Sequence, residues 1–305
     1  MTLAFFIPRM MPGDPASAIF ARFKGKLQPE ALQALRETFG FSDGPLAEQY
    51  LNYMGHVLRG DLGLSVSFFP AKVSSVIATG LFWTLWLAGI AVVISFVLGT
   101  LLGVLSAWRR GGKLDSLLPP MLVFLGAFPY FWLAMLALFL LGFRLEWFPV
   151  RHAYAGHLEP GLRWDFIVSV LRHSVLPAGT IVVATMGGWL LSMRNTMVSV
   201  LGEDYTRFAY AKGLSDRRIM FHYAARNALL PNVTGFGMAL GFVLSGSLLT
   251  EIIFSYPGQG YLLIQAVRGL DYPLIQGLFL TITIAVLGAN MLVDVVYVFL
   301  DPRAR

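Results

Sequence analysis

The feature that most restricts the fold of this chain is a run of 27 residues without a charged side chain, FWTLWLAGIAVVISFVLGTLLGVLSAW at 82–108. A helix of about 20 apolar residues is long enough to cross the hydrocarbon core of a bilayer. Similar apolar runs follow at 117–142, 175–193, 231–254 and 277–300. A helix satisfies its own backbone groups in lipid, and the runs lack the two-residue alternation of barrel strands. The sequence therefore predicts an all-α polytopic membrane protein with five complete spans.

The composition supports this class and excludes others. Hydrophobic residues make up 56% of the chain and charged residues 13%, about half the charged share of an ordinary soluble domain. The net charge of +6 does not indicate nucleic acid, because the basic residues lie in connections between apolar runs, where membrane topology accounts for them. The absence of cysteine excludes disulfides, thiolate metal ligands and cysteine nucleophiles.

The connections between the runs differ in their density of Lys and Arg. The denser group, with 11 such residues in 49, comprises 109–116, 194–229 and the tail after Leu300. The sparser group, with 11 in 117, comprises 12–75, 143–173 and 255–276. Because basic residues accumulate on the cytoplasmic side, the first group and the C-terminus are predicted to be cytoplasmic.

This topology needs a crossing before the extracytoplasmic segment 12–75. Residues 1–11 would reach only about 16 Å as a helix, roughly half a bilayer. We expect them to be the outer end of a first transmembrane helix whose inner half is missing. A cleaved signal peptide is the alternative, but the basic start and small-residue cleavage site of such a peptide are not found. The transmembrane domain is then expected at 76–305.

Two further patterns concern local packing. In the outer segment, PEALQALRETFG (29–40) and PLAEQYLNYMGHVL (45–58) carry apolar residues at three- and four-residue steps, which predicts short amphipathic helices. Within the apolar runs, Gly99 with Gly103 and Gly237 with Gly241 have the four-residue spacing that lets two helices approach closely.

The segment 195–230 is longer than a turn between two spans requires. EDYTRFAYAKG predicts a helix that ends at Gly213, and LSDRRIMFHYAARNALL predicts a second one with Ser215 as N-cap and Asp216 in its first turn. Such a helix can insert into a groove on a cytoplasmic partner. The alternative is a solvated loop that only sets topology, and the residues alone leave both interpretations open.

The candidate contact residues of this segment are small or basic. Ala209, Ala211 and Gly213 would permit close approach by a partner. The basic residues, which could pair with acidic side chains or phospholipid head groups, are Arg207, Lys212, Arg217 and Arg218.

The sequence carries no recognisable catalytic or nucleotide-binding motif. Gly25-Lys26 is followed by Leu27 and lacks the preceding glycine of a phosphate-binding loop, so nucleotide would be handled by another chain. His152 and His157 have no further clustered ligand, and no metal site is predicted. Asp294 lies within the last apolar run, where a carboxylate could serve an ion-gradient-driven transporter or bond a neighbouring helix.

Several motifs resemble one known family. YTRFAYAKGLS (205–215) and RNALLP (226–231) are similar to the cytoplasmic loop of the dipeptide/oligopeptide/nickel permeases, a branch of the binding-protein-dependent ABC importers. The general importer pattern E-A-A-x-x-x-G is altered, because Arg207 and Phe208 replace its Glu and first Ala. The other matching segments, in the same order as in that family, are residues 11–15 with Met11 in place of Leu, GHVLRGDLGLSV (55–66), EIIFSYPGQG (251–260), RGLDYPLIQG (268–277) and NMLVDVVYVFLDPRAR (290–305).

The resemblance implies a six-helix type I importer permease in a bacterial or archaeal inner membrane. Its implied partners are a second homologous permease, two ATP-binding subunits and an extracytoplasmic substrate-binding protein, with no cofactor in this chain and ATP and Mg²⁺ on the ATPase subunits. The implied cargo is di- and oligopeptides, with oligosaccharides or nickel complexes as alternatives. The ATPase-coupling residues would be Arg207, Phe208, Ala209, Ala211, Lys212, Gly213, Leu214 and Ser215. The residues implied in a gate or in structure are Glu251, Pro257, Gly258 and Asp294.

Overall fold

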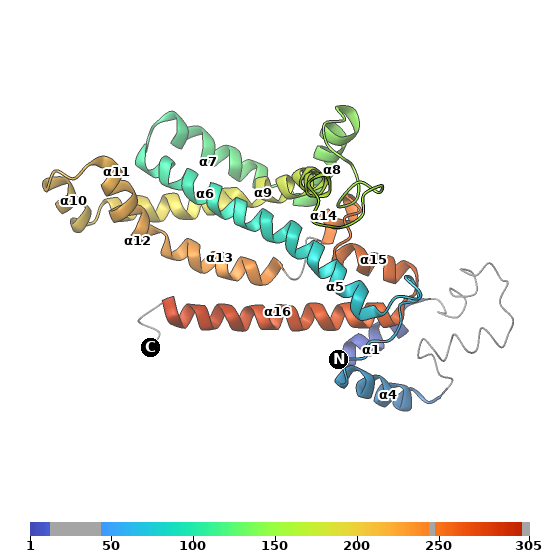
Figure 1. Ribbon diagram of the computed structural model, residues 1–305. Helices are drawn as coiled ribbons and strands as arrows, with labels where there is room; N and C mark the ends of the chain where they lie inside the picture. Colours follow the sequence, from blue (N-terminus) through green and yellow to red (C-terminus); the bar gives the residue numbers. More distant parts are fainter. Residues whose placement is uncertain (13–43, 244–247, 301–305) are drawn as a thin grey trace. The chain divides into compact units, whose positions relative to one another are not determined.

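The computed structural model describes residues 1–12, 44–243 and 248–300, and this part of the chain is predominantly helical (Figure 1). The chain divides into two compact units. The smaller unit combines Met1–Thr84 with Pro257–Leu287, and the larger combines Leu85–Tyr256 with Gly288–Arg305. The predicted all-α class is confirmed for the described residues.

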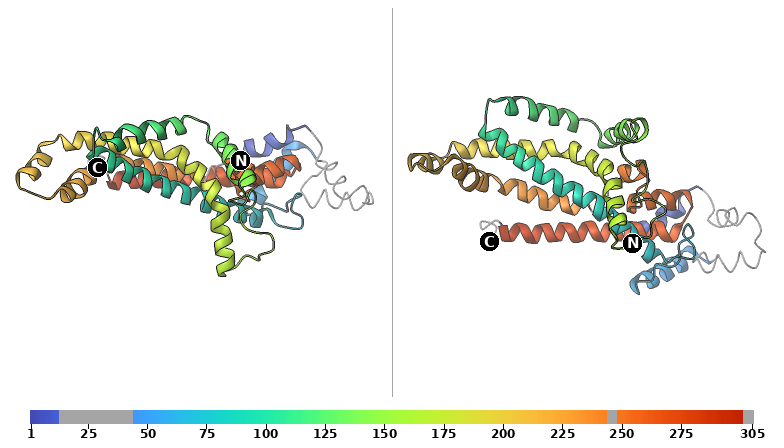
Figure 2. Two further views of the ribbon diagram at one scale, coloured as in Figure 1. Left: turned by 90° about the horizontal axis from the view of Figure 1, so that it is seen from above. Right: turned by 45° about the horizontal axis from the view of Figure 1, so that its top comes forward.

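The larger unit is built around one long helix, α9, which packs against α6, α7 and α13 (Figure 1). Its helices in chain order, with η marking π-helical stretches, are η1 (Leu85–Gly89), α6 (Ile90–Trp108), α7 (Lys113–Gly126), α8 (Tyr130–Ala137), η2 (Leu138–Arg144), α9 (Trp164–Leu201), α10 (Asp204–Ala211), α11 (Asp216–Arg218), η3 (Ile219–Ala225), α12 (Arg226–Ala228), α13 (Leu230–Val243) and α14 (Leu248–Ile253). In both further views, α10 and α11 lie at the end of α9 (Figure 2).

The contact between α6 and α9 depends on two glycines. A Cβ at Gly99 would lie 2.7 Å from the Met186 carbonyl oxygen, and one at Gly103 would lie 2.7 Å from the Leu190 carbonyl oxygen. Both distances are shorter than carbon and oxygen atoms tolerate, so any larger residue would push the helices apart. The prediction for the Gly99 and Gly103 pair is confirmed, whereas the one for Gly237 and Gly241 stays a prediction.

Two helical segments among the described residues are long and apolar enough to cross a membrane, Val73–Trp108 with 36 residues and Trp164–Leu201 with 38. The first joins α5, η1 and α6 and contains the predicted run 82–108. The second, α9, extends beyond the predicted run 175–193 at both ends and contains Pro177. At 1.5 Å per residue α9 is about 57 Å long, so it reaches well beyond a hydrocarbon core of about 30 Å.

The prediction of one uninterrupted span at 117–142 is wrong. The helical segments Lys113–Gly126 and Tyr130–Arg144 are bent by 96° at the break between them. Pro129 is the N-cap of α8 and has an extended ψ of 128°. Because proline donates no backbone hydrogen bond and disfavours helical geometry in the residue before it, the helix stops here although the side chains remain apolar. Within the described part of the chain, a third spanning segment is counted only if this bent pair is taken as one span.

The two remaining predicted runs are also helical where the structure describes them. The run 231–254 contains α13 and α14, and residues 244–247 between them lie outside the described residues. The run 277–300 falls within α16 (Tyr272–Leu300), which begins in the smaller unit.

The smaller unit contains α1 (Thr2–Arg9), α4 (Leu46–Leu58), α5 (Val73–Thr84), α15 (Gln259–Arg268) and the first part of α16. The helix predicted at 45–58 is confirmed as α4, whereas the one predicted at 29–40 lies outside the described residues. Val73 and Ile77 of α5 pack with Leu262 of α15 and Leu278 of α16 in a buried core.

A buried carboxylate fixes the connection before α5 in this unit. Asp271 is fully buried and accepts hydrogen bonds from the Ser65 hydroxyl, the Ser67 backbone N–H at 2.7 Å and the Leu274 backbone N–H at 3.1 Å. Several hydrogen-bond donors offset the free-energy cost of burying a carboxylate. Asp271, part of the motif RGLDYPLIQG, therefore joins the residues just before α5 to the start of α16.

Candidate functional site

The candidate site is the helical segment that follows α9 in the larger unit. After α9 ends at Leu201, the chain turns at Gly202 and begins α10 at Asp204, with Glu203 as N-cap. The Thr206 hydroxyl donates to the Val200 carbonyl oxygen at 3.0 Å, and Thr206 is fully buried. This bond folds α10 back onto the last turn of α9, so the two helices are held together at their junction.

The C-terminus of α10 is closed by a Schellman motif. The Gly213 N–H donates to the Tyr210 carbonyl oxygen at 2.9 Å, and the Leu214 N–H donates to the Ala209 carbonyl oxygen at 3.3 Å. Gly213 has a φ of +69°, a left-handed conformation that glycine adopts without steric cost. The prediction that this helix ends at Gly213 is confirmed.

The second helix begins where the sequence predicts. Ser215 is at the N-cap of α11 with an extended backbone, and Asp216 is in the first turn, although the Ser215 side chain makes no capping hydrogen bond. The helical path continues through η3 and α12 to Leu229, and Pro231 is the second residue of α13. The order of helix, glycine turn, helix and apolar helix therefore agrees with the sequence analysis.

One face of α10 is buried and the other is exposed. Thr206 and Ala209, three residues apart, have exposures of 0% and 2%. The exposed residues of the predicted set are Arg207, Phe208, Ala211, Lys212, Gly213 and Ser215, and Leu214 is half-buried. Phe208 is 69% exposed, so its apolar ring lies among the charged side chains of this surface.

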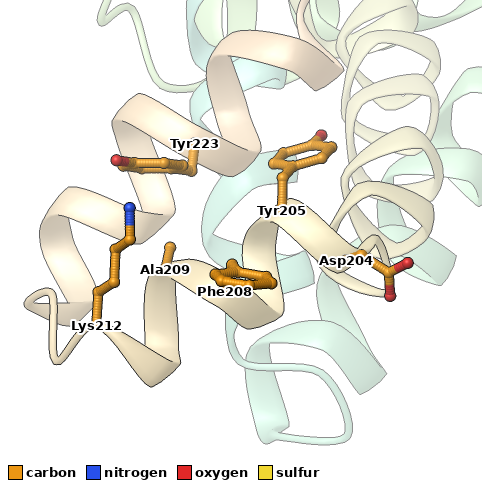
Figure 3. Close-up of a pocket in the computed structure, with 6 residues that line it drawn as sticks. All are labelled: Asp204, Tyr205, Phe208, Ala209, Lys212 and Tyr223. Atoms are coloured by element: carbon orange, nitrogen blue, oxygen red, sulfur yellow. The ribbon is translucent and has the colours of Figure 1, made fainter.

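A pocket of about 420 Å³ opens beside α10 (Figure 3). It is lined by Asp204, Tyr205, Phe208, Ala209, Lys212 and Tyr223. Figure 3 shows Phe208 beside Ala209 on α10, the Lys212 side chain extending toward Tyr223, and Asp204 at the far end. The pocket therefore combines an aromatic wall with one cation and one anion.

Sequence analysis missed the contributions of Tyr205 and Tyr223 to this pocket. The two residues are 18 positions apart and come from α10 and η3, so their proximity depends on how these helices pack. The sequence feature that could have indicated them is the presence of tyrosines among charged residues in 195–230, because aromatic residues with a polar tip are frequent at binding surfaces.

The electrostatic character of this surface is positive. The exposed basic residues of this segment are Arg207, Lys212, Arg217, Arg218 and Arg226, and its exposed acidic residues are Glu203, Asp204 and Asp216. The Arg207 Nη1 and Asp204 Oδ1 atoms lie 3.7 Å apart, but the two side chains are 72% and 95% exposed, so water screens the pair.

Tyr210 of α10 stacks near Trp108 of α6, with 6.5 Å between the ring centroids. Partial burial raises the pKa of the Tyr210 hydroxyl.

The other predicted residues are not part of this site. Glu251 is fully buried in α14 of the larger unit, and its backbone carbonyl accepts a hydrogen bond from the Tyr256 N–H at 2.8 Å. Pro257 is half-buried and Gly258 is the buried N-cap of α15, both in the smaller unit. Asp294 lies within α16, and its side chain is not among those that the structure describes.

Comparison with known proteins identifies similar chains. Residues 99–305 match the family described as binding-protein-dependent transport system inner membrane component. A putative peptide permease protein of Brucella suis is 35% identical over 303 residues, which cover 99% of this chain and 93% of that protein. The oligopeptide transport system permease protein AppB of Bacillus subtilis is 34% identical, with 99% and 92% covered. The di/tripeptide transport system permease protein DppB of Pseudomonas aeruginosa is 35% identical, with 99% and 93% covered.

Proposed function

This chain belongs to the family of binding-protein-dependent transport system inner membrane components, and from that premise we propose that it is the permease subunit of an ATP-driven importer, with α10 as its contact to a cytoplasmic ATPase. The observation that carries the proposal is an exposed phenyl group and an aromatic pocket on a helix that is fixed at both ends. A rigid helix with an exposed apolar side chain binds a groove with little loss of conformational entropy.

The charge of the site indicates the chemistry of the partner surface. Arg207, Lys212, Arg217 and Arg218 outnumber the acidic residues around α10. An ATPase surface with carboxylates around an apolar groove would complement them, and the positive charge would accelerate association. Ala211 and Gly213, which carry little or no side chain, leave space for the partner backbone beside the helix.

The remaining parts of the transporter are proposed from the family and from the topology. The denser basic connections, α10 and the C-terminus lie on the cytoplasmic side of the inner membrane. ATP and Mg²⁺ bind to two ATPase subunits rather than to this chain, a second homologous permease completes the pathway, and an extracytoplasmic binding protein delivers the substrate. Closure of the ATPases moves α10 and changes which side of the membrane the pathway faces.

Peptides are the proposed cargo. The relatives named above carry the words peptide, oligopeptide and di/tripeptide in their names. Oligosaccharides and nickel complexes are the alternatives for the same type of transporter. The ion-gradient-driven transporter considered from Asp294 has less support, because the family belongs to binding-protein-dependent systems.

The proposal is tested by reconstituting the chain in lipid nanodiscs with the permease, ATPase and binding protein encoded beside it. Lys212→Glu reverses a charge in the pocket, and Arg110→Glu reverses an exposed charge in the connection before α7 as a matched control. We expect Lys212→Glu to weaken ATPase binding at least about tenfold, because like charges would then face each other, and Arg110→Glu to leave the affinity nearly unchanged.

Peptide-stimulated ATP hydrolysis is measured in the same complexes. Loss of this stimulation in Lys212→Glu alone supports the assignment of α10. Equal binding by both variants would move the ATPase contact elsewhere on the chain. Peptide uptake driven by a proton gradient in the absence of the ATPases would favour the ion-gradient alternative.

A further inference from the structure

A partly buried ion pair connects α7 to α9 in the larger unit. Arg194 donates to Asp115 through both Nε and Nη2, with the second hydrogen bond at 3.0 Å. The Asp115 side chain is 7% exposed and the Arg194 side chain 25%. A guanidinium that meets a carboxylate with two parallel hydrogen bonds fixes both distance and orientation. The two residues are 79 positions apart in the sequence, so this contact is tertiary.

The same carboxylate also binds α6 and the connection before α7. Oδ1 accepts from the Ser106 hydroxyl of α6 at 2.9 Å, and Oδ2 accepts from the Gly111 backbone N–H at 2.9 Å. Each carboxylate oxygen therefore has two donors. Three helices and one connection meet at Asp115, and the donors compensate the desolvation of its charge.

The first turns of α7 need this support because of their sequence. Pro119 and Pro120 lie inside the helix. Proline has no N–H, so the carbonyl groups of Asp115 and Ser116 lack their intrahelical donors four residues ahead. The residue that Arg194 binds is therefore one whose carbonyl group has no backbone donor four residues ahead in α7.

The ion pair lies close to the proposed ATPase contact. Arg194 is seven residues before the end of α9, about 10 Å along the helix axis. Met193 and Met197 of α9 pack in one buried cluster with Val104 of α6 and with Met220 of η3. The ends of α6 and α9 and the helices after α10 are therefore already packed together, and Asp115 adds α7 to them.

We propose that Asp115 and Arg194 are a positioning pair that makes the ends of α6, α7 and α9 move together with α10. The inference rests on the proposed function, because it concerns how a movement of α10 reaches the membrane helices. Asp115 does not need Arg194 in order to hold the connection at 109–112, because the Ser106 hydroxyl and the Gly111 N–H already donate to its carboxylate. The two hydrogen bonds from Arg194 add a direct link between α9 and α7, and such a link is needed if a movement of α9 is to reach α7.

Removing the pair should separate ATP hydrolysis from transport. In the complete transporter in proteoliposomes, Asp115→Asn and Arg194→Gln should still bind the ATPases, while the number of peptides transported per ATP hydrolysed falls about tenfold. Arg194→Lys keeps the charge but loses the fork geometry, and should fall between these variants and the unsubstituted chain. An unchanged ratio of transport to hydrolysis in Asp115→Asn and Arg194→Gln overturns the inference.

A second measurement remains decisive if these variants fold poorly. The chain has no cysteine, so Asp115→Cys with Arg194→Cys introduces the permease's only thiols, which a short reducible bis-methanethiosulfonate reagent can join; the partner subunits are used in cysteine-free form. A covalent link between α7 and α9 should restore the transport ratio, and reduction should abolish it again. Failure of the link to restore coupling, with ATPase binding intact, refutes the positioning role but leaves the proposed function in place. Absence of ATPase binding in the unsubstituted chain would instead refute the proposed function.

Discussion

Replacement of Phe208 by alanine tests the proposed ATPase contact most directly. Its ring is 69% exposed on α10, so a partner that covers it gains the apolar surface now facing water. Alanine has the highest helix propensity, so the substitution removes the ring without weakening the helix. The buried residues Thr206 and Ala209 of the same helix are left unchanged.

The expected loss of affinity follows from the exposure of this ring. Full burial of a Phe side chain stabilises by about 1.5–3 kcal/mol, so covering the exposed two-thirds should contribute about 1–2 kcal/mol. Since each 1.4 kcal/mol is tenfold, the Kd for the ATPase subunit should rise by about 5- to 30-fold. The Kd is measured by biolayer interferometry with the permease pair in nanodiscs and purified ATPase subunit in solution.

Phe143→Ala is the matched control for this experiment. Phe143 is 73% exposed on η2, well separated in the sequence from α10, so its loss removes a similar exposed ring. We expect its Kd to equal that of the unsubstituted chain. A Phe208→Ala variant whose Kd lies within about twofold of the unsubstituted value would show that the ring stays in water, and the proposed contact face would be wrong.

Three further predictions test the geometry described above. Gly213→Ala places a Cβ at a φ of +69° and should destabilise the end of α10 by about 1 kcal/mol, whereas Gly213→Asn should cost less; amide hydrogen exchange across α10 measures both. Gly103→Ala puts a Cβ 2.7 Å from a backbone oxygen of α9 and should lower stability by about 1–3 kcal/mol, whereas Gly89→Ala, with open space around it, should not lower the melting temperature in detergent. An equal melting temperature for these two variants would contradict the close packing of α6 and α9. Asp271→Asn replaces one accepting oxygen by a donor, so the connection around Ser67 should become more sensitive to protease by limited digestion; unchanged cleavage would show that the carboxylate does not hold it.

Sequence patterns predicted the candidate site well where the signals are local. Gly213 stops α10 because glycine adopts the left-handed conformation whatever packs around it, and the next helix then begins after Ser215 as predicted. The family resemblance likewise depends on order and spacing along the chain. The roles assigned to the exposed residues in ATPase binding stay predictions.

The features that sequence patterns did not predict depend on tertiary packing. Tyr205 and Tyr223 share a pocket only because α10 and η3 lie beside it, and no spacing rule relates residues on separate helices. Asp115 and Arg194 meet across 79 positions for the same reason. The 96° bend was missed for a different reason, since hydropathy over 117–142 registers the apolar side chains and not the backbone restriction at Pro129.

The length of α9 has a mechanical consequence. From Pro177 to Leu201 the helix extends over 24 residues, about 36 Å, and Pro177 lacks the N–H that would bond the preceding turn. If this continuous helix tilted as a rigid rod about the proline, α10 would move with its far end, to which the Thr206 hydroxyl holds it. A tilt of only about 10° at the pivot would sweep α10 through about 6 Å, roughly one helical turn. A small rotation of α9 at Pro177 would then correspond to a large displacement of α10 at the other end of the helix.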